Sequence, residues 1–297
     1  MTLLGKRVLI TGSQGFTGRY MAAEMESAGC QVLGLGSLPS PEADYHQVDL
    51  TDRSALIALI AELKPDVVIH LAALAFVGHG DANAFYHVNL QGTRNLLEAL
   101  DACDKKPEAI LLASSANVYG NASSGMISEF VPPAPANDYA VSKLAMEHMA
   151  KLWFNKLPII ITRPFNYTGV GQAKNFLLPK IVAHFKALAD SIELGNLDVA
   201  RDFSDVRSVV NAYRCLVEAK AFGRVVNVCS GQATSLLQII ESCKVLSGHD
   251  LSVRVNPDFV RQNEVKTLCG DAGLLKSLIG EWHTPSLDDT LRWMLAN

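Results

Sequence analysis

Short apolar runs of strand length recur in the first half of this chain, and each is followed by a stretch with helical spacing. The runs lie at residues 7–10, 31–35, 66–70, 109–113 and 158–162. The stretches with apolar residues at helical spacing are 16–28, 54–63, 84–103 and 139–154. Short, nearly continuous apolar strands that alternate with helices predict a parallel sheet covered on both faces.

The predicted fold class is therefore α/β, with a doubly wound parallel sheet of the Rossmann type over residues 1–165. Beyond residue 165 the alternation weakens, and short strand patterns are mixed with helices and with loops that contain Gly and Pro. We expect residues 166–297 to form mainly a smaller substrate-binding α/β lobe, with some segments returning to the large sheet. Ligands of such folds bind beyond the carboxyl ends of the strands.

Composition excludes several classes of function. Charged residues make up 19% of the 297, the net charge is −4, and Lys and Arg are spread along the chain, unlike the basic patch of a nucleic-acid-binding protein. No apolar run approaches the ~18 residues of a membrane span, and the start of the chain lacks a signal-peptide pattern. The six cysteines form no CxxC pair. We expect a cytoplasmic protein with reduced cysteines, no metal site, no nucleic-acid partner and no membrane partner.

The first apolar run ends in a glycine-rich turn, TGSQGFTG at residues 11–18, which opens the first helix. Gly12 permits the tight turn, Gly15 lets a pyrophosphate approach the backbone, and Gly18 lets the helix pack closely on the strand. The helix N-terminus offers N–H groups to the phosphates. An ordinary strand–turn–helix can also contain such glycines, but the position between a strand and a helix favours a dinucleotide site that includes Gln14 and Phe16.

Residues at other strand ends fit the same site. Asp49 and Leu50 follow a further strand-like segment that lies between the 31–35 and 66–70 runs, where an acid can meet the exocyclic amine of adenine. Leu71, Ala72 and Ala73 follow the next strand, and their small size permits close approach of the cofactor.

The choice of cofactor between NADP and NAD stays open. An acid at the end of the second strand would bind the ribose 2′-hydroxyl of NAD, and an Arg nearby would favour the 2′-phosphate of NADP. This chain has Gly36 and Ser37 there, so either cofactor fits and Ser37 is a candidate contact. Pro164, just after the fifth apolar run, is another.

Tyr139 and Lys143 are spaced by one helical turn and share a helix face. A cation so close favours phenolate, so we expect Lys143 to lower the pKa of Tyr139 and also to hold the nicotinamide ribose. Tyr139 then exchanges a proton with a substrate oxygen while hydride moves to or from the nicotinamide. Ser115 follows the 109–113 strand, where its hydroxyl can align the same oxygen. Each motif alone arises often by chance, but their order with the glycine turn predicts an oxidoreductase.

In this order the motifs resemble the extended short-chain dehydrogenase/reductase superfamily, also called the NAD-dependent epimerase/dehydratase family, over nearly the whole chain. The resemblance implies that Ser115, Tyr139 and Lys143 are the catalytic triad, with Tyr139 and Lys143 also contacting the cofactor. It further implies a homodimer formed through a four-helix bundle of residues 84–103 and 139–154.

Four segments of the second half, residues 163–172, 175–179, 195–203 and 261–265, resemble the GDP-mannose 4,6-dehydratase branch and its smaller relatives, the GDP-4-keto-6-deoxy-mannose reductases. The resemblance implies a nucleotide-sugar substrate, with a GDP-sugar favoured. The implied substrate-binding residues are Ser115, Asn117, Asn166, Asn175, Lys180, Arg201, Arg261 and Glu264. Guanidinium groups suit phosphates and a carboxylate suits ribose hydroxyls, although each charge alone would also fit a solvated surface.

Asn117 bears on whether the chain catalyses dehydration or reduction. A dehydratase of this branch needs a carboxylate base, commonly two positions after the catalytic Ser or Thr, and a neutral amide cannot take that proton at a useful rate. Asn117 argues against a dehydratase more than it argues for a reductase, because the reductases can carry an acid there too. We expect reduction of GDP-4-keto-6-deoxy-D-mannose to GDP-rhamnose or its C4 epimer. A nucleotide-sugar 4-epimerase with bound NAD is the alternative; a GDP-mannose 4,6-dehydratase or a non-catalytic nucleotide-binding protein is less favoured.

Overall fold

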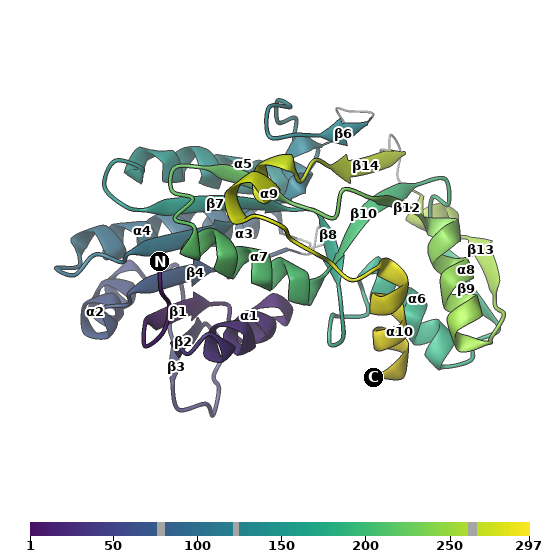
Figure 1. Cartoon of the computed structure of the whole chain (residues 1–297), viewed down its shortest axis with the longest axis horizontal. Coiled ribbons are helices and arrows are strands. Elements are labelled where there is room, and N and C mark those ends of the chain that lie inside the picture. The colour runs from purple at the N-terminus through teal and green to yellow at the C-terminus, as the bar shows by residue number, and fades with distance from the viewer. Residues whose placement is uncertain (76–80, 121–124, 261–265) are drawn as a thin grey trace.

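The computed structural model describes residues 1–75, 81–120, 125–260 and 266–297. Within these ranges, seven parallel strands form one sheet in the order β11-β7-β5-β4-β1-β2-β3 (Figure 1). The strands are β1 Arg7–Thr11, β2 Gln31–Gly36, β3 Tyr45–Gln47, β4 Val67–His70, β5 Ala109–Ala113, β7 Ile159–Pro164 and β11 Val225–Val228. The order runs one way from β1 through β2 and the other way from β4 through β5, so a ligand crevice is expected at the carboxyl ends of β1 and β4. The predicted doubly wound sheet is confirmed.

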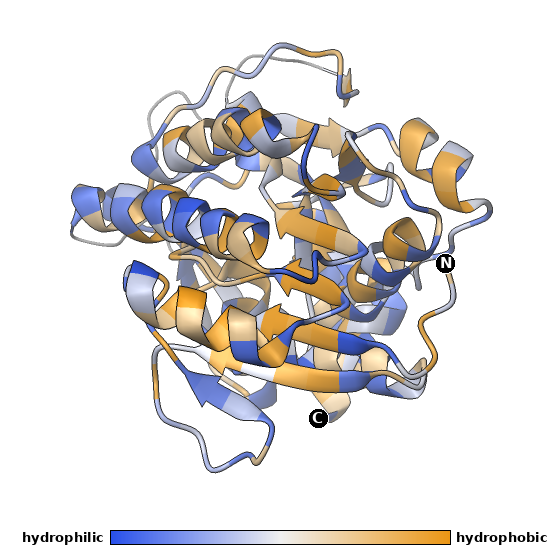
Figure 2. Cartoon of the chain, turned by 90° about the vertical axis from the view of Figure 1, so that its left-hand side faces the viewer, coloured by the Kyte–Doolittle hydropathy of each residue, from blue (hydrophilic) through white to orange (hydrophobic). Residues whose placement is uncertain are grey.

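Helices cover both faces of this sheet. Helices α1 Phe16–Ser27, α7 Val206–Glu218 and α9 Gly273–Ile279 share one hydrophobic cluster with the sheet. Helices α2 Arg53–Leu63, α4 Thr93–Ala102 and α5 Asp138–Ala150 share the cluster on the opposite face. In Figure 2 the strands are largely orange, whereas several helices turn blue faces outward. Burial on both faces is the reason that the strand sequences are continuously apolar.

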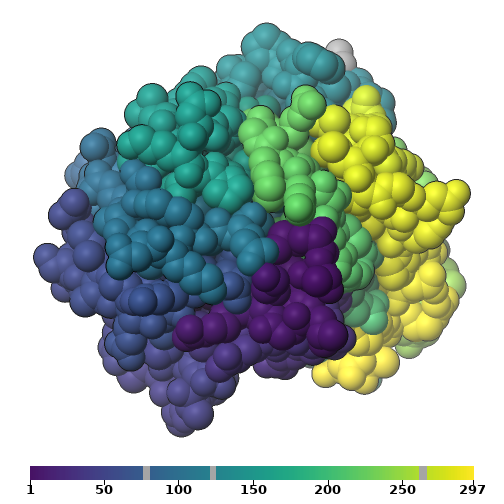
Figure 3. All heavy atoms as spheres, turned by 60° about the vertical axis from the view of Figure 1, so that its left-hand side comes forward, coloured from purple at the N-terminus to yellow at the C-terminus, as the bar shows by residue number. Residues whose placement is uncertain are grey.

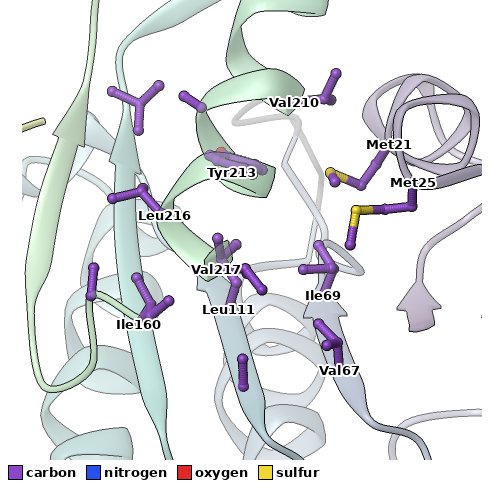
Figure 4. Packing of buried hydrophobic residues seen from close by; sticks show 14 of the residues in the cluster. Met21, Met25, Val67, Ile69, Leu111, Ile160, Val210, Tyr213, Leu216 and Val217 are labelled. Carbon is purple, nitrogen blue, oxygen red and sulfur yellow. The ribbon is translucent and has the colours of Figure 1, made fainter. Parts of the chain in front are cut away.

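Residues from both halves of the sequence build the core beneath α7. Met21 and Met25 of α1 lie beside Ile69 of β4, and Tyr213 of α7 lies above the neighbouring strands (Figure 4). In the space-filling view the purple N-terminal segment lies against green residues of the second half (Figure 3), where the Met1 amino group donates to the Glu218 carbonyl. Burial of each side chain of this size stabilises the folded state by ~1.5–3 kcal/mol. The large sheet is therefore complete only with segments after residue 205, and the domain boundary at residue 165 stays a prediction.

A smaller lobe is built on a second sheet. Strands β12 Ala233–Ser235, β10 Ala200–Asp205, β14 Thr267–Gly270 and β6 Met126–Ile127 pair in that order, and β8 Asn166–Thr168 pairs with β10. A third hydrophobic cluster joins helices α6 Leu177–Lys186, α8 Leu236–Ser247 and α10 Leu287–Ala296 to the β9 Ser191–Leu194 and β13 Ser252–Val255 pair. Figure 1 shows these helices at the end of the molecule away from α2 and α4.

The predicted helix over residues 84–103 is interrupted. It consists of α3 Ala82–Phe85, a π-helix Tyr86–Gly92, and α4. Asn89 of the π-helix holds the backbone of Leu74 through two hydrogen bonds, from the Leu74 N–H at 2.9 Å and to the Leu74 carbonyl at 3.1 Å. Such π-turns occur frequently at functional sites, and this one ties the loop after β4 to the helix layer.

Three further observations concern the described ranges alone. No helix there has both the length and the apolar character needed to cross a membrane. No cluster of three or more His, Cys, Asp or Glu side chains in the same ranges is arranged to hold a metal ion. The cysteines are free thiols at positions Cys30, Cys103, Cys215, Cys229, Cys243 and Cys269.

Candidate active site

The turn between β1 and α1 has the backbone shape that a pyrophosphate needs. Gly12 has a φ of +71°, and a Cβ there would lie 2.9 Å from the backbone N and Cα of Ala72. A Cβ on Gly18 would lie 2.1 Å from the Gly12 carbonyl oxygen. Helix α1 begins after Gly15 with no side chain capping its first N–H groups. The positive end of the helix is therefore available to an anion, and the residues fit a dinucleotide.

The other predicted cofactor contacts lie along the carboxyl edge of the sheet. Ser37 follows β2, Asp49 and Leu50 follow β3, Leu71, Ala72 and Ala73 follow β4, Pro164 ends β7, and Gln14 and Phe16 lie in the glycine turn. The Ala72 N–H donates to Thr11 Oγ1 at 3.1 Å, which fixes the loop after β4 beside the turn. Asp49 Oδ1 accepts from the Thr51 N–H and hydroxyl, both at 2.8 Å. That carboxylate is thereby held at the end of β3.

Ser115 and Tyr139 come together at the end of β5. The Ser115 hydroxyl is close enough to the Tyr139 phenol to lower its pKa, and Ser115 Oγ accepts from the Asn117 N–H at 3.1 Å. Lys143 follows one turn along α5, and its ammonium donates to the Ala113 carbonyl at 2.8 Å. The three side chains of Ser115, Tyr139 and Lys143 are all buried. Two hydroxyl groups thus lie together at the sheet edge, and Lys143 lies one helical turn along α5 from Tyr139.

The expected effect of Lys143 on Tyr139 was wrong. Burial raises the pKa of the Tyr139 phenol to about 12, opposed by the hydrogen bond from Ser115. Burial also lowers the pKa of Lys143 to about 8, with the Glu147 carboxylate opposing the shift. The i, i+4 spacing indicates closeness but carries no information on desolvation, which here is the larger effect.

Replacing Lys143 by Met is expected to stabilise the chain without cofactor. Below pH about 8 the lysine is protonated in both folded and unfolded chains, so the folded state bears the full cost of burying the charge. Between pH 8 and 10.5 the unfolded chain binds more protons, and stability rises with pH. Lys143→Met should therefore raise the free energy of unfolding by roughly 3 kcal/mol at pH 7, with a gain that shrinks toward pH 10.5.

Urea unfolding of both proteins at pH 7 and pH 10 measures this difference. Lys174→Met, at an exposed position, is the matched control and should change stability by less than ~0.5 kcal/mol. If Lys143→Met raises the free energy of unfolding equally at both pH values, the lowered pKa assigned to Lys143 is contradicted.

A buried ion pair that the sequence analysis missed lies next to the candidate catalytic residues. Arg163 of β7 donates to Glu147 of α5 through Nε at 2.9 Å and Nη2 at 2.6 Å. The Ser114 hydroxyl donates to the same carboxylate at 2.6 Å, and Arg163 Nη1 donates to the Tyr119 hydroxyl at 3.0 Å. Because Ser114 precedes Ser115, this network fixes the end of β5. The signal available in the sequence was an acid one turn after Lys143 on the same helix face.

A second buried network joins the glycine turn to α5. His70 Nδ1 lies 2.7 Å from Thr11 Oγ1, and His70 Nε2 lies 2.8 Å from Thr93 Oγ1. Burial and the nearby Lys143 charge lower the pKa of His70 to about 3, so the ring is neutral. Thr93 donates to the Asn89 carbonyl, and the Asn89 amide donates to the Ser142 hydroxyl at 3.1 Å. No single sequence motif indicates this hydrogen-bond network, because its members come from four separate segments.

The predicted substrate residues are distributed over the smaller lobe. Asn166 lies on β8 opposite Phe203 of β10, which places it on the strand next to that of Arg201. Asn175 is exposed in the loop before α6. Lys180 of α6 donates to the Glu193 carbonyl at 2.7 Å, so its ammonium is directed to β9. Arg261 and Glu264 lie outside the described residues.

A cavity of about 300 Å³ lies in the same lobe. Its lining residues are Gly195, Asn196, Leu197, Asp198, Val199, Val255, Val260 and Lys266. Arg201 donates to the Lys266 carbonyl at 3.3 Å, so one predicted substrate residue borders it. Neither Ser115 nor Tyr139 belongs to the described lining.

The model of a protein family described as "NAD dependent epimerase/dehydratase family" matches residues 8–229. Among curated proteins, a GDP-6-deoxy-D-talose 4-dehydrogenase from Aggregatibacter actinomycetemcomitans is 33% identical over 92% of this chain and 91% of its own length. A GDP-6-deoxy-D-mannose reductase from Pseudomonas aeruginosa is 33% identical over 98% of this chain and 97% of its own.

Two solved structures are also similar. A candidate epimerase from Burkholderia cenocepacia is 50% identical, with a TM-score of 0.94 and coverage of 99% of this chain and 98% of that one. The structure of RMD from Pseudomonas aeruginosa complexed with NADPH is 32% identical, with a TM-score of 0.87 and coverage of 98% and 97%. The similarity thus extends over both the large sheet and the smaller lobe.

Proposed function

This chain belongs to the NAD dependent epimerase/dehydratase family, and we propose that it reduces the 4-keto group of a nucleotide sugar with NADPH or NADH. The favoured substrate is GDP-4-keto-6-deoxy-D-mannose, and the product is a GDP-6-deoxyhexose, either GDP-rhamnose or its C4 epimer. The names of two relatives that match over nine-tenths of this chain refer to GDP-6-deoxyhexoses, which supports the GDP assignment.

The observation that carries the proposal is that Ser115 and Tyr139 lie together, both buried, at the carboxyl edge of the sheet that also holds the glycine turn. When bound, the nicotinamide supplies the hydride. The Ser115 hydroxyl orients the sugar carbonyl, and the Tyr139 phenol donates the proton to its oxygen. A Tyr139 pKa of about 12 keeps the phenol protonated at neutral pH, as a proton donor in the reductive direction must be.

Asn117 supports reduction over elimination. It is the second residue of the 3₁₀ turn Ala116–Tyr119 after Ser115 and donates its backbone N–H to the Ser115 oxygen at 3.1 Å. A carboxylate here would lie beside the sugar and could remove its C5 proton, whereas an amide has no basic site for that proton at neutral pH. Reduction requires a proton donor and a hydride only, and Ser115 and Tyr139 meet the first requirement.

The sugar nucleotide is proposed to extend from this pair into the smaller lobe. Asn166 on β8 and Arg201 on the neighbouring β10 would hold the sugar and its phosphates. A guanidinium matches phosphate oxygens in geometry and charge. Lys180 is the weakest of the predicted contacts, because its ammonium is directed to the Glu193 carbonyl and the Phe259 ring.

A nucleotide-sugar 4-epimerase is the second candidate, favoured by the 50% identity to the candidate epimerase of Burkholderia cenocepacia. Ser115 and Tyr139 would serve such an enzyme equally well, with the proton moving in both directions. The two reactions differ in cofactor use, because an epimerase recycles tightly bound NAD and a reductase consumes the reduced nicotinamide.

The proposal is tested by mixing the protein with freshly generated GDP-4-keto-6-deoxy-D-mannose and either NADPH or NADH. The expected result is loss of the reduced-nicotinamide absorbance in proportion to the keto sugar added, with no loss when GDP-mannose replaces it. No loss with either nicotinamide rules out the reductase. Interconversion of C4 epimers without added cofactor would instead identify the epimerase.

A further inference from the structure

The connection between β2 and β3 folds back over the end of β2. The Tyr45 hydroxyl donates to the Leu38 carbonyl, and the Gln47 amide donates to the Ser37 carbonyl at 3.0 Å. The Val48 N–H donates to the Gly36 carbonyl at 2.9 Å. These bonds hold the loop of residues 38–44 against the strand end where an acidic side chain is missing.

This loop brings Glu42 to the glycine turn. The Gln14 amide donates to Glu42 Oε2 at 2.7 Å, and Gln14 lies between Gly12 and Gly15 in the turn. The Glu42 carbonyl accepts from the Tyr45 N–H at 3.3 Å, so the backbone at Glu42 is itself tied to the start of β3. The Glu42 carboxylate therefore lies between the glycine turn and the end of β2, the region in which the adenosine ribose of a dinucleotide lies in folds of this kind.

The charge of the side chain beside this ribose decides whether a 2′-hydroxyl or a 2′-phosphate is accepted. A carboxylate accepts hydrogen bonds from a free 2′-hydroxyl and repels a 2′-phosphate. The guanidinium that contacts the turn is that of Arg19, and it donates to the Gln14 carbonyl at 3.2 Å and the Gly171 carbonyl at 3.4 Å. Arg19 is thus directed toward the smaller lobe, whereas the Gln14 side chain bonds Glu42.

We infer that Glu42 takes the place of the acid missing at the end of β2 and makes the site select NAD over NADP. The inference deepens the proposed function, because it rests on the glycine turn holding the dinucleotide. The structure of the Pseudomonas aeruginosa relative contains NADPH, and that protein is 32% identical to this chain. The selectivity is therefore assigned to the β2–β3 loop of this chain and not to the family.

Equilibrium titration with NADH and NADPH, followed by nicotinamide fluorescence in the absence of any sugar, tests the inference. The unmodified protein should bind NADH more tightly by about ten-fold or more, and Glu42→Gln should reduce the NADPH/NADH ratio of dissociation constants by about ten-fold. Asp44→Asn is the matched control: it removes the same charge from the same loop at an exposed position and should leave the ratio unchanged.

Preference of the unmodified protein for NADPH overturns the inference. An equal change in the ratio for Glu42→Gln and Asp44→Asn also overturns it, since such a change would reflect only the total negative charge of the loop. Failure to bind either nicotinamide overturns both the inference and the proposed dinucleotide site. A clear NADH preference that depends on Glu42, together with no reduction of the keto sugar, supports the inference and refutes the proposed substrate alone.

Discussion

Tyr139→Phe is expected to lower kcat for keto-sugar reduction by about 10²–10⁴-fold. The substitution removes the phenol that is proposed to donate the proton while keeping the ring. Tyr139 is 8% exposed and packs edge-on against Phe85 with ring centroids 6.0 Å apart, a contact that Phe can retain. The dissociation constant for the reduced nicotinamide should change little, because the main elements proposed to bind it are the glycine turn and Lys143.

Initial rates of nicotinamide oxidation with saturating keto sugar measure this effect. Tyr86→Phe is the matched control, because it makes the same chemical change at a phenol on the adjacent π-helix that donates to Asp138 at 2.7 Å. That variant should keep most of the activity. More than a tenth of the original kcat in Tyr139→Phe would show that another group protonates the product.

Gly18→Ala is expected to reduce dinucleotide affinity by about ten- to hundred-fold and to destabilise the fold by ~1–3 kcal/mol. The added Cβ would lie 2.1 Å from the Gly12 carbonyl oxygen and 2.7 Å from the Cα and carbonyl oxygen of Ser13. Every close neighbour is backbone, so the clash can be relieved only by moving the turn away from the helix N-terminus. The N–H groups that are proposed to bind the phosphates move with it.

Denaturant unfolding and fluorescence titration of the same preparation separate the two effects. Gly15→Ala is a one-methyl change in the same turn, at which the new Cβ would lie 3.1 Å from the Gly12 oxygen and φ is −71°. It should destabilise the fold much less than Gly18→Ala. Equal losses of stability in the two variants would contradict the packing argument for Gly18.

Most strands of the large sheet were predictable because both of their faces are buried, whereas β3 is a short polar strand without a buried residue. An apolar run at 109–113 matches β5 residue for residue, and the helix expected over 16–28 corresponds to α1. The π-helix was not predictable from periodicity. Its register depends on bonds between Asn89 and the backbone of Leu74, a partner from another segment of the chain.

The grouping of Ser115, Tyr139 and Lys143 at one strand end was predictable, whereas their pKa values were not. Spacing placed Tyr139 and Lys143 on one helix face, but the buried surroundings that raise one pKa and lower the other come from the packing of α5 on the sheet. The Glu147–Arg163 pair joins residues from α5 and β7, and only the folded chain brings them together. The roles of the substrate residues and the homodimer remain predictions, because they concern partners outside a single chain.

The central claim is that hydride from the nicotinamide and a proton from Tyr139 reach the same sugar carbonyl. Transfer from nicotinamide deuterated at C4, in both stereochemical forms, to GDP-4-keto-6-deoxy-D-mannose tests it most directly by mass spectrometry and NMR of the product. We predict one deuterium at C4 of the GDP-6-deoxyhexose with one of the two forms, matched to the nicotinamide oxidised. A product that carries no deuterium at C4, or conversion of the sugar without nicotinamide oxidation, would contradict it.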